Sequence, residues 1–170
     1  ILNKRTDGYG GNLENRGRFA LEIVRRIKEE VGDSIPIDYK LAIIRPNEGM
    51  AGPTLDEAKI MAKWLVDAGV DMLHVTPANH NAVYYVIPPM GVLPYGCFVY
   101  LAEVIKRVVD VPITTVGRIV DPEHTERILS EGKADFVAMG RALVADPEWI
   151  IKAKEGRYDD ICKCIMCNQC

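Results

Sequence analysis

The sequence predicts an α/β fold in which four βα units form half of a (βα)8 TIM barrel. Short apolar runs alternate with amphipathic helical segments along the whole chain, and this alternation is typical of a parallel sheet with crossover helices. Two of the runs end in the same dipeptide, Gly117-Arg118 and Gly140-Arg141. Because βα barrels often bind phosphate in the loops after their last two strands, the repeated dipeptide indicates a barrel with a phosphate site.

The elements follow one another in the order that this fold requires. A helical stripe of apolar residues over 13–31 precedes an apolar run over 35–44, which predicts the first strand. Thr54 and Glu57 have the spacing of a capping box at the start of an amphipathic helix over 55–68. The remaining strands are expected at 72–76, 113–116 and 136–139, and the remaining helices at 98–109, 121–132 and 147–156.

The composition is that of a soluble globular protein, with 48% hydrophobic and 26% charged residues in a chain of 170. A net charge of -3 gives no reason to expect a nucleic-acid partner, and no apolar run is long enough for a membrane helix. The chain begins at Ile1 rather than Met, and half a barrel would leave two open strand edges. We therefore expect a piece of a longer protein, with a half-barrel over 1–160 and a cysteine-rich segment over 161–170.

Four of the five cysteines fall within the last nine residues. This clustering is typical of metal ligands rather than of a disulfide framework, and it indicates a reducing, cytoplasmic location. Cys164, Cys167 and Cys170 have the spacing C-x2-C-x2-C, which allows three thiolates to converge on one centre. The spacing favours an iron–sulfur cluster over a zinc ribbon, which usually has two separated pairs. The fourth ligand is then Cys162 or a cysteine beyond the given residues.

The two Gly-Arg dipeptides have two interpretations. Each one alone could be a strand-end turn followed by a surface arginine. Together, at the ends of consecutive strands, they favour a clamp for one phosphorylated ligand. Gly117 and Gly140 would let the ligand approach the backbone, and Arg118 and Arg141 would supply permanent positive charge.

Lys40 and two histidines are further candidates. Lys40 interrupts an otherwise buried strand, so it either pairs with a carboxylate such as Asp38, reaches solvent, or directs its charge at an electron-rich ligand near the barrel axis. His74 lies inside the strand over 72–76 and is expected to be a hydrogen-bonded core residue. His80 follows that strand, where barrels carry catalytic side chains, and is the candidate proton donor.

Three stretches, in the same order, resemble the iron–sulfur branch of the Old Yellow Enzyme family of NADH:flavin oxidoreductases. Residues 3–16, NKRTDGYGGNLENR, are close to the family signature N-x-R-x-D-x-Y/W-G-G-x-x-x-N-R. Residues 132–147, GKADFVAMGRALVADP, resemble its last barrel strand, and residues 164–169, CIMCNQ, resemble the cluster motif after the barrel. This branch includes 2,4-dienoyl-CoA reductase, clostridial enoate reductases and trimethylamine dehydrogenase.

The resemblance implies the C-terminal half of an FMN-binding barrel. The family's phosphate contacts match the two Gly-Arg dipeptides, and its cation beside the flavin pyrimidine matches Lys40, where many members have arginine. A histidine that polarises the substrate lies within one residue of His80 in dienoyl-CoA reductases. A [4Fe–4S] cluster would relay electrons from FAD to FMN in the full-length protein, with NAD(P)H as their source.

The implied activity is reduction of an activated C=C bond in a small molecule, such as an enoate or a 2,4-dienoyl-CoA. The cysteine spacing follows trimethylamine dehydrogenase rather than the C-x2-C-x3-C of dienoyl-CoA reductases, so an amine dehydrogenase is the runner-up. Two rivals outside this chemistry are a non-catalytic zinc-binding half-barrel and a flavin-free barrel that binds phosphate. We expect the isolated 170 residues to bind FMN weakly or not at all, and to be inactive.

Overall fold

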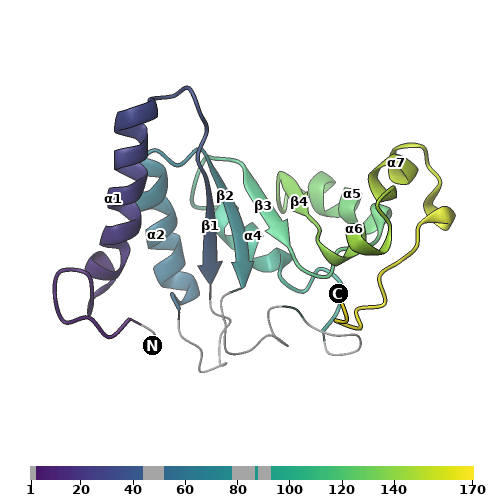
Figure 1. Cartoon of the computed structure of the whole chain (residues 1–170), viewed down its shortest axis with the longest axis horizontal. Helices are drawn as coiled ribbons and strands as arrows, with labels where there is room; N and C mark the ends of the chain where they lie inside the picture. The colour runs from purple at the N-terminus through teal and green to yellow at the C-terminus, as the bar shows by residue number, and fades with distance from the viewer. Residues whose placement is uncertain (1–2, 44–51, 78–86, 88–92) are drawn as a thin grey trace.

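The computed structural model describes residues 3–43, 52–77, 87 and 93–170 (Figure 1). These residues form one four-stranded parallel sheet with the order β1-β2-β3-β4, so each strand lies beside its predecessor in the chain. The strands are β1 Asp38–Ile43, β2 Met72–Pro77, β3 Ile113–Val116 and β4 Phe136–Ala138. The predicted parallel sheet of an α/β fold is therefore confirmed, with β1 and β4 at its two edges.

Helices precede, connect and follow the strands, and those that follow β1, β2 and β3 pack against the sheet (Figure 1). They are α1 Leu13–Val31, α2 Leu55–Asp67, α4 Val99–Lys106, α5 Pro122–Ser130, α6 Arg141–Ala145, α7 Trp149–Lys154 and the 3-10 helix η1 Tyr158–Asp160. The predicted helices agree with these to within a few residues, whereas α6 and η1 are too short to show a hydrophobic period in the sequence. Within the described part of the chain, no helix has the length and apolarity that crossing a membrane requires.

The hydrophobic core lies between the sheet and these helices. Leu41, Leu73 and Ile113 point from three strands into this layer and are at most 2% exposed. They meet Leu65 of α2 and Ile105 of α4, which are equally buried. Because side chains alternate along a strand, the residues between these core positions lie on the other face of the sheet.

That other face carries the residues that a closed barrel would enclose. Lys40, His74, Thr114 and Phe136 lie side by side across it, because the strand registers pair each with the next. Of the alternatives left open for Lys40, the structure agrees with a side chain that reaches solvent, because Lys40 is exposed. The apolar run that suggested burial is buried only at alternate positions, and Lys40 occupies one of the positions between them.

At the amino-terminal end of the sheet, two aspartates make the same pair of contacts. Asp71, just before β2, accepts hydrogen bonds from the backbone N of Ile37 at 2.8 Å and from Nζ of Lys28 at 2.9 Å. Asp135, just before β4, accepts one from the backbone N of Ile113 at 2.9 Å and one from the ammonium of the last residue of α4. Each carboxylate therefore ties the start of the neighbouring strand to a helix.

Candidate functional site

A cavity of about 200 Å³ lies where β3 and β4 end. Gly117, Arg118, Gly140 and Arg141 all line it, together with Met166 from the carboxyl-terminal tail. The structure thus brings both Gly-Arg dipeptides to one place at the carboxyl edge of the sheet, where barrels of this class bind ligands. Pockets that bind whole small-molecule ligands usually have volumes of about 300–1,000 Å³. The cavity therefore has the size for one group of a ligand, such as a phosphate.

A sharp turn at the end of β3 explains why glycine stands at position 117. Gly117 has a φ of +131°, which L-residues rarely adopt. A Cβ atom at this position would lie 2.4 Å from Cδ2 of Phe98, whose side chain is only 1% exposed. Arg118 continues the turn with a φ of +50°, which is uncommon for a residue other than glycine. The turn keeps the backbone of both residues at the wall of the cavity.

The side chain of Arg118 holds the segment 93–95 against this turn. Its Nη1 donates a hydrogen bond to the backbone O of Leu93. Its guanidinium carbon lies 5.2 Å from the centre of the Tyr95 ring, which is within the range of a cation–π contact. Arg118 is only 7% exposed. It therefore lines the cavity and also fixes the neighbouring loop.

Arg141 makes a different kind of contact. Its Nη1 donates to Oδ1 of Asn168, and Nδ2 of Asn168 donates to the backbone O of Ile87 at 2.9 Å. A neutral amide fixes the guanidinium without cancelling its charge, which a carboxylate would do. Sequence analysis did not single out Asn168. Its place between two candidate ligand cysteines was the one available signal.

Lys40 and His74 form a polar patch on the open face of the sheet, outside the cavity lining. His74 is half-buried, and its Nε2 has no hydrogen-bond partner among the described residues. Burial lowers the pKa of His74 below its ordinary 6.5, and Lys40 lowers it further against the opposing effect of Asp38. The imidazole is therefore neutral at pH 7, and it is not the hydrogen-bonded core residue that was expected. His80 lies outside the described residues.

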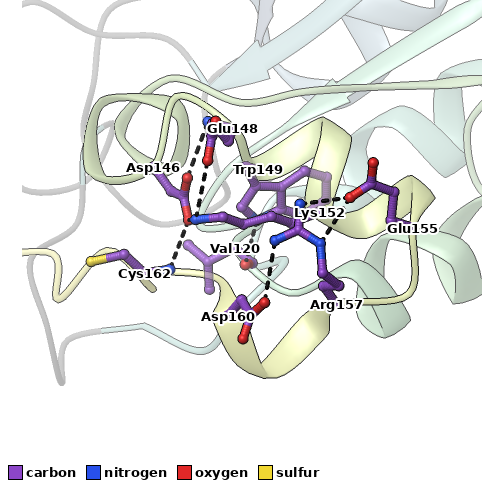
Figure 2. A network of polar contacts seen from close by, with 9 residues as sticks. All are labelled: Val120, Asp146, Glu148, Trp149, Lys152, Glu155, Arg157, Asp160 and Cys162. Carbon is purple, nitrogen blue, oxygen red and sulfur yellow. Dashed lines mark hydrogen bonds and ion pairs between the residues drawn. The ribbon is translucent and has the colours of Figure 1, made fainter.

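A buried carboxylate fixes the start of the carboxyl-terminal tail (Figure 2). Asp146 is 3% exposed and accepts hydrogen bonds from Nζ of Lys152 at 2.8 Å, the backbone N of Cys162 at 2.9 Å and the backbone N of Glu148 at 3.0 Å. The Lys152 ammonium, followed by the Cys162 amide, holds the pKa of Asp146 below its ordinary 3.8. Asp146 is thus a charged anchor that joins α6, α7 and the first cysteine of the tail.

Beyond Cys162 the tail runs back to the carboxyl edge of the sheet, as the yellow end of the chain in Figure 1 shows. Nζ of Lys163 binds the carboxylate of Asp121 at 2.8 Å. Met166 is 2% exposed and packs against Val120 and Ala142. The tail is therefore docked by both polar and apolar contacts on the segments that follow β3 and β4.

The three candidate ligand cysteines all lie on this docked tail. Cys164, Cys167 and Cys170 are free thiols, and Sγ of Cys164 accepts a hydrogen bond from the backbone N of Met166 at 3.4 Å. Among the described residues, no group of three or more His, Cys, Asp or Glu side chains is arranged to hold a metal ion. The structure thus places the three thiols on one segment without bringing their sulfur atoms together.

The family follows from comparison with known proteins. The model of the NADH:flavin oxidoreductase / NADH oxidase family matches residues 1–160. The chain belongs to this family. It is 51% identical over 166 residues to the NADH oxidase of Thermoanaerobacter brockii, and the match covers 98% of this chain and 25% of that protein.

Two solved structures of similar proteins share the fold. A 2-naphthoyl-CoA reductase in complex with 2-naphthoyl-CoA superimposes with a TM-score of 0.86 at 35% identity, over 98% of this chain and 25% of its own. Histamine dehydrogenase from Rhizobium sp. 4-9 has a TM-score of 0.83 at 32% identity, over 98% of this chain and 23% of its own. The chain spans about a quarter of the length of these relatives. The matches confirm the resemblance and the barrel fold class that the sequence predicted.

The cavity of this family member fits the phosphate of a flavin mononucleotide. A Cβ built on Gly140 would meet nothing within 4 Å, so the backbone there is open to a ligand. Arg141 lines the same cavity and keeps its charge beside the neutral Asn168. An open glycine backbone and an arginine guanidinium are features that favour binding of a phosphate group.

The tail fits an iron–sulfur cluster in its donor chemistry. It supplies three free thiols at three-residue intervals. Met166 and Asn168, which separate the cysteines, have positive φ angles of 60° and 56°. Thiolates are the ligands that iron–sulfur clusters require.

Proposed function

We propose that these residues form the phosphate-binding part of an FMN-dependent oxidoreductase that uses NAD(P)H to reduce an activated C=C bond. A [4Fe–4S] cluster, with Cys164, Cys167 and Cys170 among its ligands, would relay the electrons. The observation that carries the proposal is the convergence of the two Gly-Arg dipeptides on one phosphate-sized cavity. Membership of a flavin oxidoreductase family supports it.

Bound FMN would supply hydride transfer to carbon. The residues of this chain would hold its phosphate. The backbone at Gly140 can approach the phosphate oxygens, because a Cβ there would meet nothing within 4 Å. Gly117 lines the same cavity, and the Phe98 ring fills the space where its side chain would be. Arg141 would donate hydrogen bonds from its planar guanidinium, which matches the geometry of a phosphate. Arg118 would add positive charge at the cavity wall and keep the segment 93–95 in place.

Lys40 and His74 would act on the open face of the sheet. The exposed ammonium of Lys40 would stabilise negative charge on an electron-rich ring. A neutral imidazole both donates and accepts a hydrogen bond, so His74 can bind a polar edge of a ligand beside Lys40. His80 is the proposed proton donor or carbonyl ligand for the substrate. The Gly-Arg dipeptides would thus bind the phosphate, and Lys40, His74 and His80 would act where the reaction takes place.

The substrate proposed is a small molecule with a conjugated carbonyl, of the enoate or 2,4-dienoyl-CoA type. The 2-naphthoyl-CoA named with the solved relative is such a conjugated acyl thioester, and this supports the proposal. A second candidate is an oxidative amine dehydrogenase. The match to histamine dehydrogenase and the C-x2-C-x2-C spacing favour it.

The test uses the complete protein encoded by the gene that carries this sequence. We expect the purified protein to be coloured and to release one FMN per chain on denaturation. With NADH or NADPH, without oxygen, it should consume an enoate such as cinnamate or a dienoyl-CoA. Flavin reduction by an amine, without any nicotinamide, would select the amine dehydrogenase instead. A colourless protein that holds zinc would contradict both proposals.

A further inference from the structure

Asn168 links the cysteine segment to the phosphate cavity. It lies between Cys167 and Cys170, yet both polar atoms of its side chain bind residues outside the tail. Oδ1 accepts from Nη1 of Arg141, and Nδ2 donates to the backbone O of Ile87 at 2.9 Å. Both Arg141 and Ile87 line the cavity. The amide therefore bridges two walls of the candidate phosphate site.

The backbone of the tail is shaped for this bridge. Asn168 has a φ of 56°, a conformation that asparagine tolerates better than most residues. Met166 has a φ of 60°, is 2% exposed and lines the same cavity. The two neighbours of Cys167, Met166 and Asn168, are thus the tail residues that contact the cavity or Arg141, while Cys167 and Cys170 are exposed.

We propose that Asn168 is a positioning residue that holds the guanidinium of Arg141 at the phosphate cavity, so that the cysteine segment sets the affinity for the phosphate of the cofactor. The inference rests on the proposed function, because it takes the cavity to bind FMN. A long arginine side chain loses rotamer freedom when it binds a ligand. The hydrogen bond from Asn168 would restrict the Arg141 side chain before the ligand binds, so that less rotamer freedom is lost on binding. As a neutral acceptor, Asn168 would not oppose the positive charge of the guanidinium.

Two variants separate this role from a general effect on folding. Asn168→Gly removes the amide but accepts the positive φ of the native backbone. Asn168→Asp keeps the shape and an acceptor for Arg141 but adds a negative charge that pairs with the guanidinium. The matched control is Gln169→Ala, because Gln169 is the exposed neighbour whose side chain bonds only weakly, at 3.5 Å, to the backbone O of Cys167.

The experiment measures dissociation constants of FMN and of riboflavin, which lacks the phosphate, for the complete protein after removal of its flavin. Asn168→Gly should weaken FMN by about tenfold, the effect of losing one hydrogen bond to a charged group. Asn168→Asp should weaken FMN further. Riboflavin should bind all variants alike, because it makes no phosphate contact, and Gln169→Ala should resemble the wild type with both ligands.

A double-mutant cycle with Arg141→Ala completes the test. If Asn168 acts through Arg141, Asn168→Gly should have no further effect on FMN affinity once Arg141 has been removed. Iron content should stay the same in Asn168→Gly, so that its weaker FMN binding is not due to a lost cluster. Additive effects in the cycle would overturn the inference.

The outcomes also separate this inference from the proposed function. If the wild type binds FMN and riboflavin equally, the phosphate clamp itself is wrong, and the role of Asn168 fails with it. If the wild type prefers FMN and Asn168→Gly keeps that preference, only the role of Asn168 is overturned. Equal weakening of both ligands by Asn168→Gly would show a merely structural role and would also overturn it.

Discussion

At the amino-terminal end of the sheet, Asp71 and Asp135 make the same pair of contacts in two different βα units. At the carboxyl-terminal end, the polar contacts differ from strand to strand and join distant segments. Arg118 binds Leu93, 25 residues away, and Asn168 binds Ile87, 81 residues away. The amino-terminal end uses the same Asp contacts twice to hold a strand to a helix. At the carboxyl-terminal end, each contact around the cavity is made by a different pair of residues.

The difference indicates that the two ends serve different purposes. The repeated aspartate contacts, which tie the start of a strand to a helix, stabilise the barrel. Unrepeated contacts around a cavity, built on positive φ angles at Gly117 and Arg118, are what a binding site needs. This division agrees with the rule that ligands bind at the carboxyl-terminal face of βα barrels. Variants at the two ends should therefore have separable effects.

The largest difference in stability is expected between alanine substitutions of two glycines at opposite ends of the sheet. Gly117→Ala combines an unfavourable φ with a Cβ placed 2.4 Å from the buried Phe98 ring, so we expect a loss of about 3 kcal/mol or more in stability. Gly132→Ala, just before β4, has a φ of 68° but nothing within 4 Å of its Cβ, and should cost about 1 kcal/mol. Urea unfolding of the complete protein, with hydrogen exchange over 113–120, measures both. Equal losses would contradict the steric argument.

A charge on the open face should act on the cofactor rather than on stability. If the proposed function holds, Lys40→Met should lower the two-electron midpoint potential of bound FMN by about 30 mV, which corresponds to about 1.4 kcal/mol. Lys40→Arg keeps the charge and should leave the potential near that of the wild type. Asp135→Asn, at the other end, should reduce stability by about 1 kcal/mol without moving the potential. A shift of equal size in Lys40→Arg would show that charge is not the cause.

Asp146, which anchors the carboxyl-terminal tail, should limit cleavage of the tail by protease. Asp146→Ala removes three hydrogen bonds, including the one from the backbone N of Cys162. Local opening of the tail should then become easier, and trypsin should cut after the exposed Lys163 about fivefold faster. Glu148→Ala is the matched control, because its side chain is 67% exposed and lies 3.9 Å from Lys152. Unchanged cleavage in Asp146→Ala would mean that other contacts hold the tail.

The sequence predicted those features of the fold that depend on residues close together in the chain. The strands, the longer helices and the two Gly-Arg dipeptides follow from apolar runs and glycine, and the structure places all of them at one sheet. The pairing of Arg141 with Asn168 spans 27 residues, and no local pattern reports a contact of that kind. The sequence left the environment of Lys40 open between solvent, a carboxylate and a ligand, because an apolar run does not show which face of its strand a barrel interior would cover. The same ambiguity made His74 look like a core residue.

The smallest effect is expected from acid at the amino-terminal end. The backbone N of Ile37 and then the ammonium of Lys28 hold the pKa of Asp71 below its ordinary 3.8. Because the unfolded chain takes up the proton first, Asp71 contributes its full stability above pH 3.8 and loses it as the pH falls through the lower folded value. Its side chain is 42% exposed, so the contribution should be below about 1 kcal/mol. The difference in unfolding free energy between wild type and Asp71→Asn should therefore be present at pH 7 and vanish in strong acid, and a difference that persists there would show that the hydrogen bond to Ile37 does not depend on the charge.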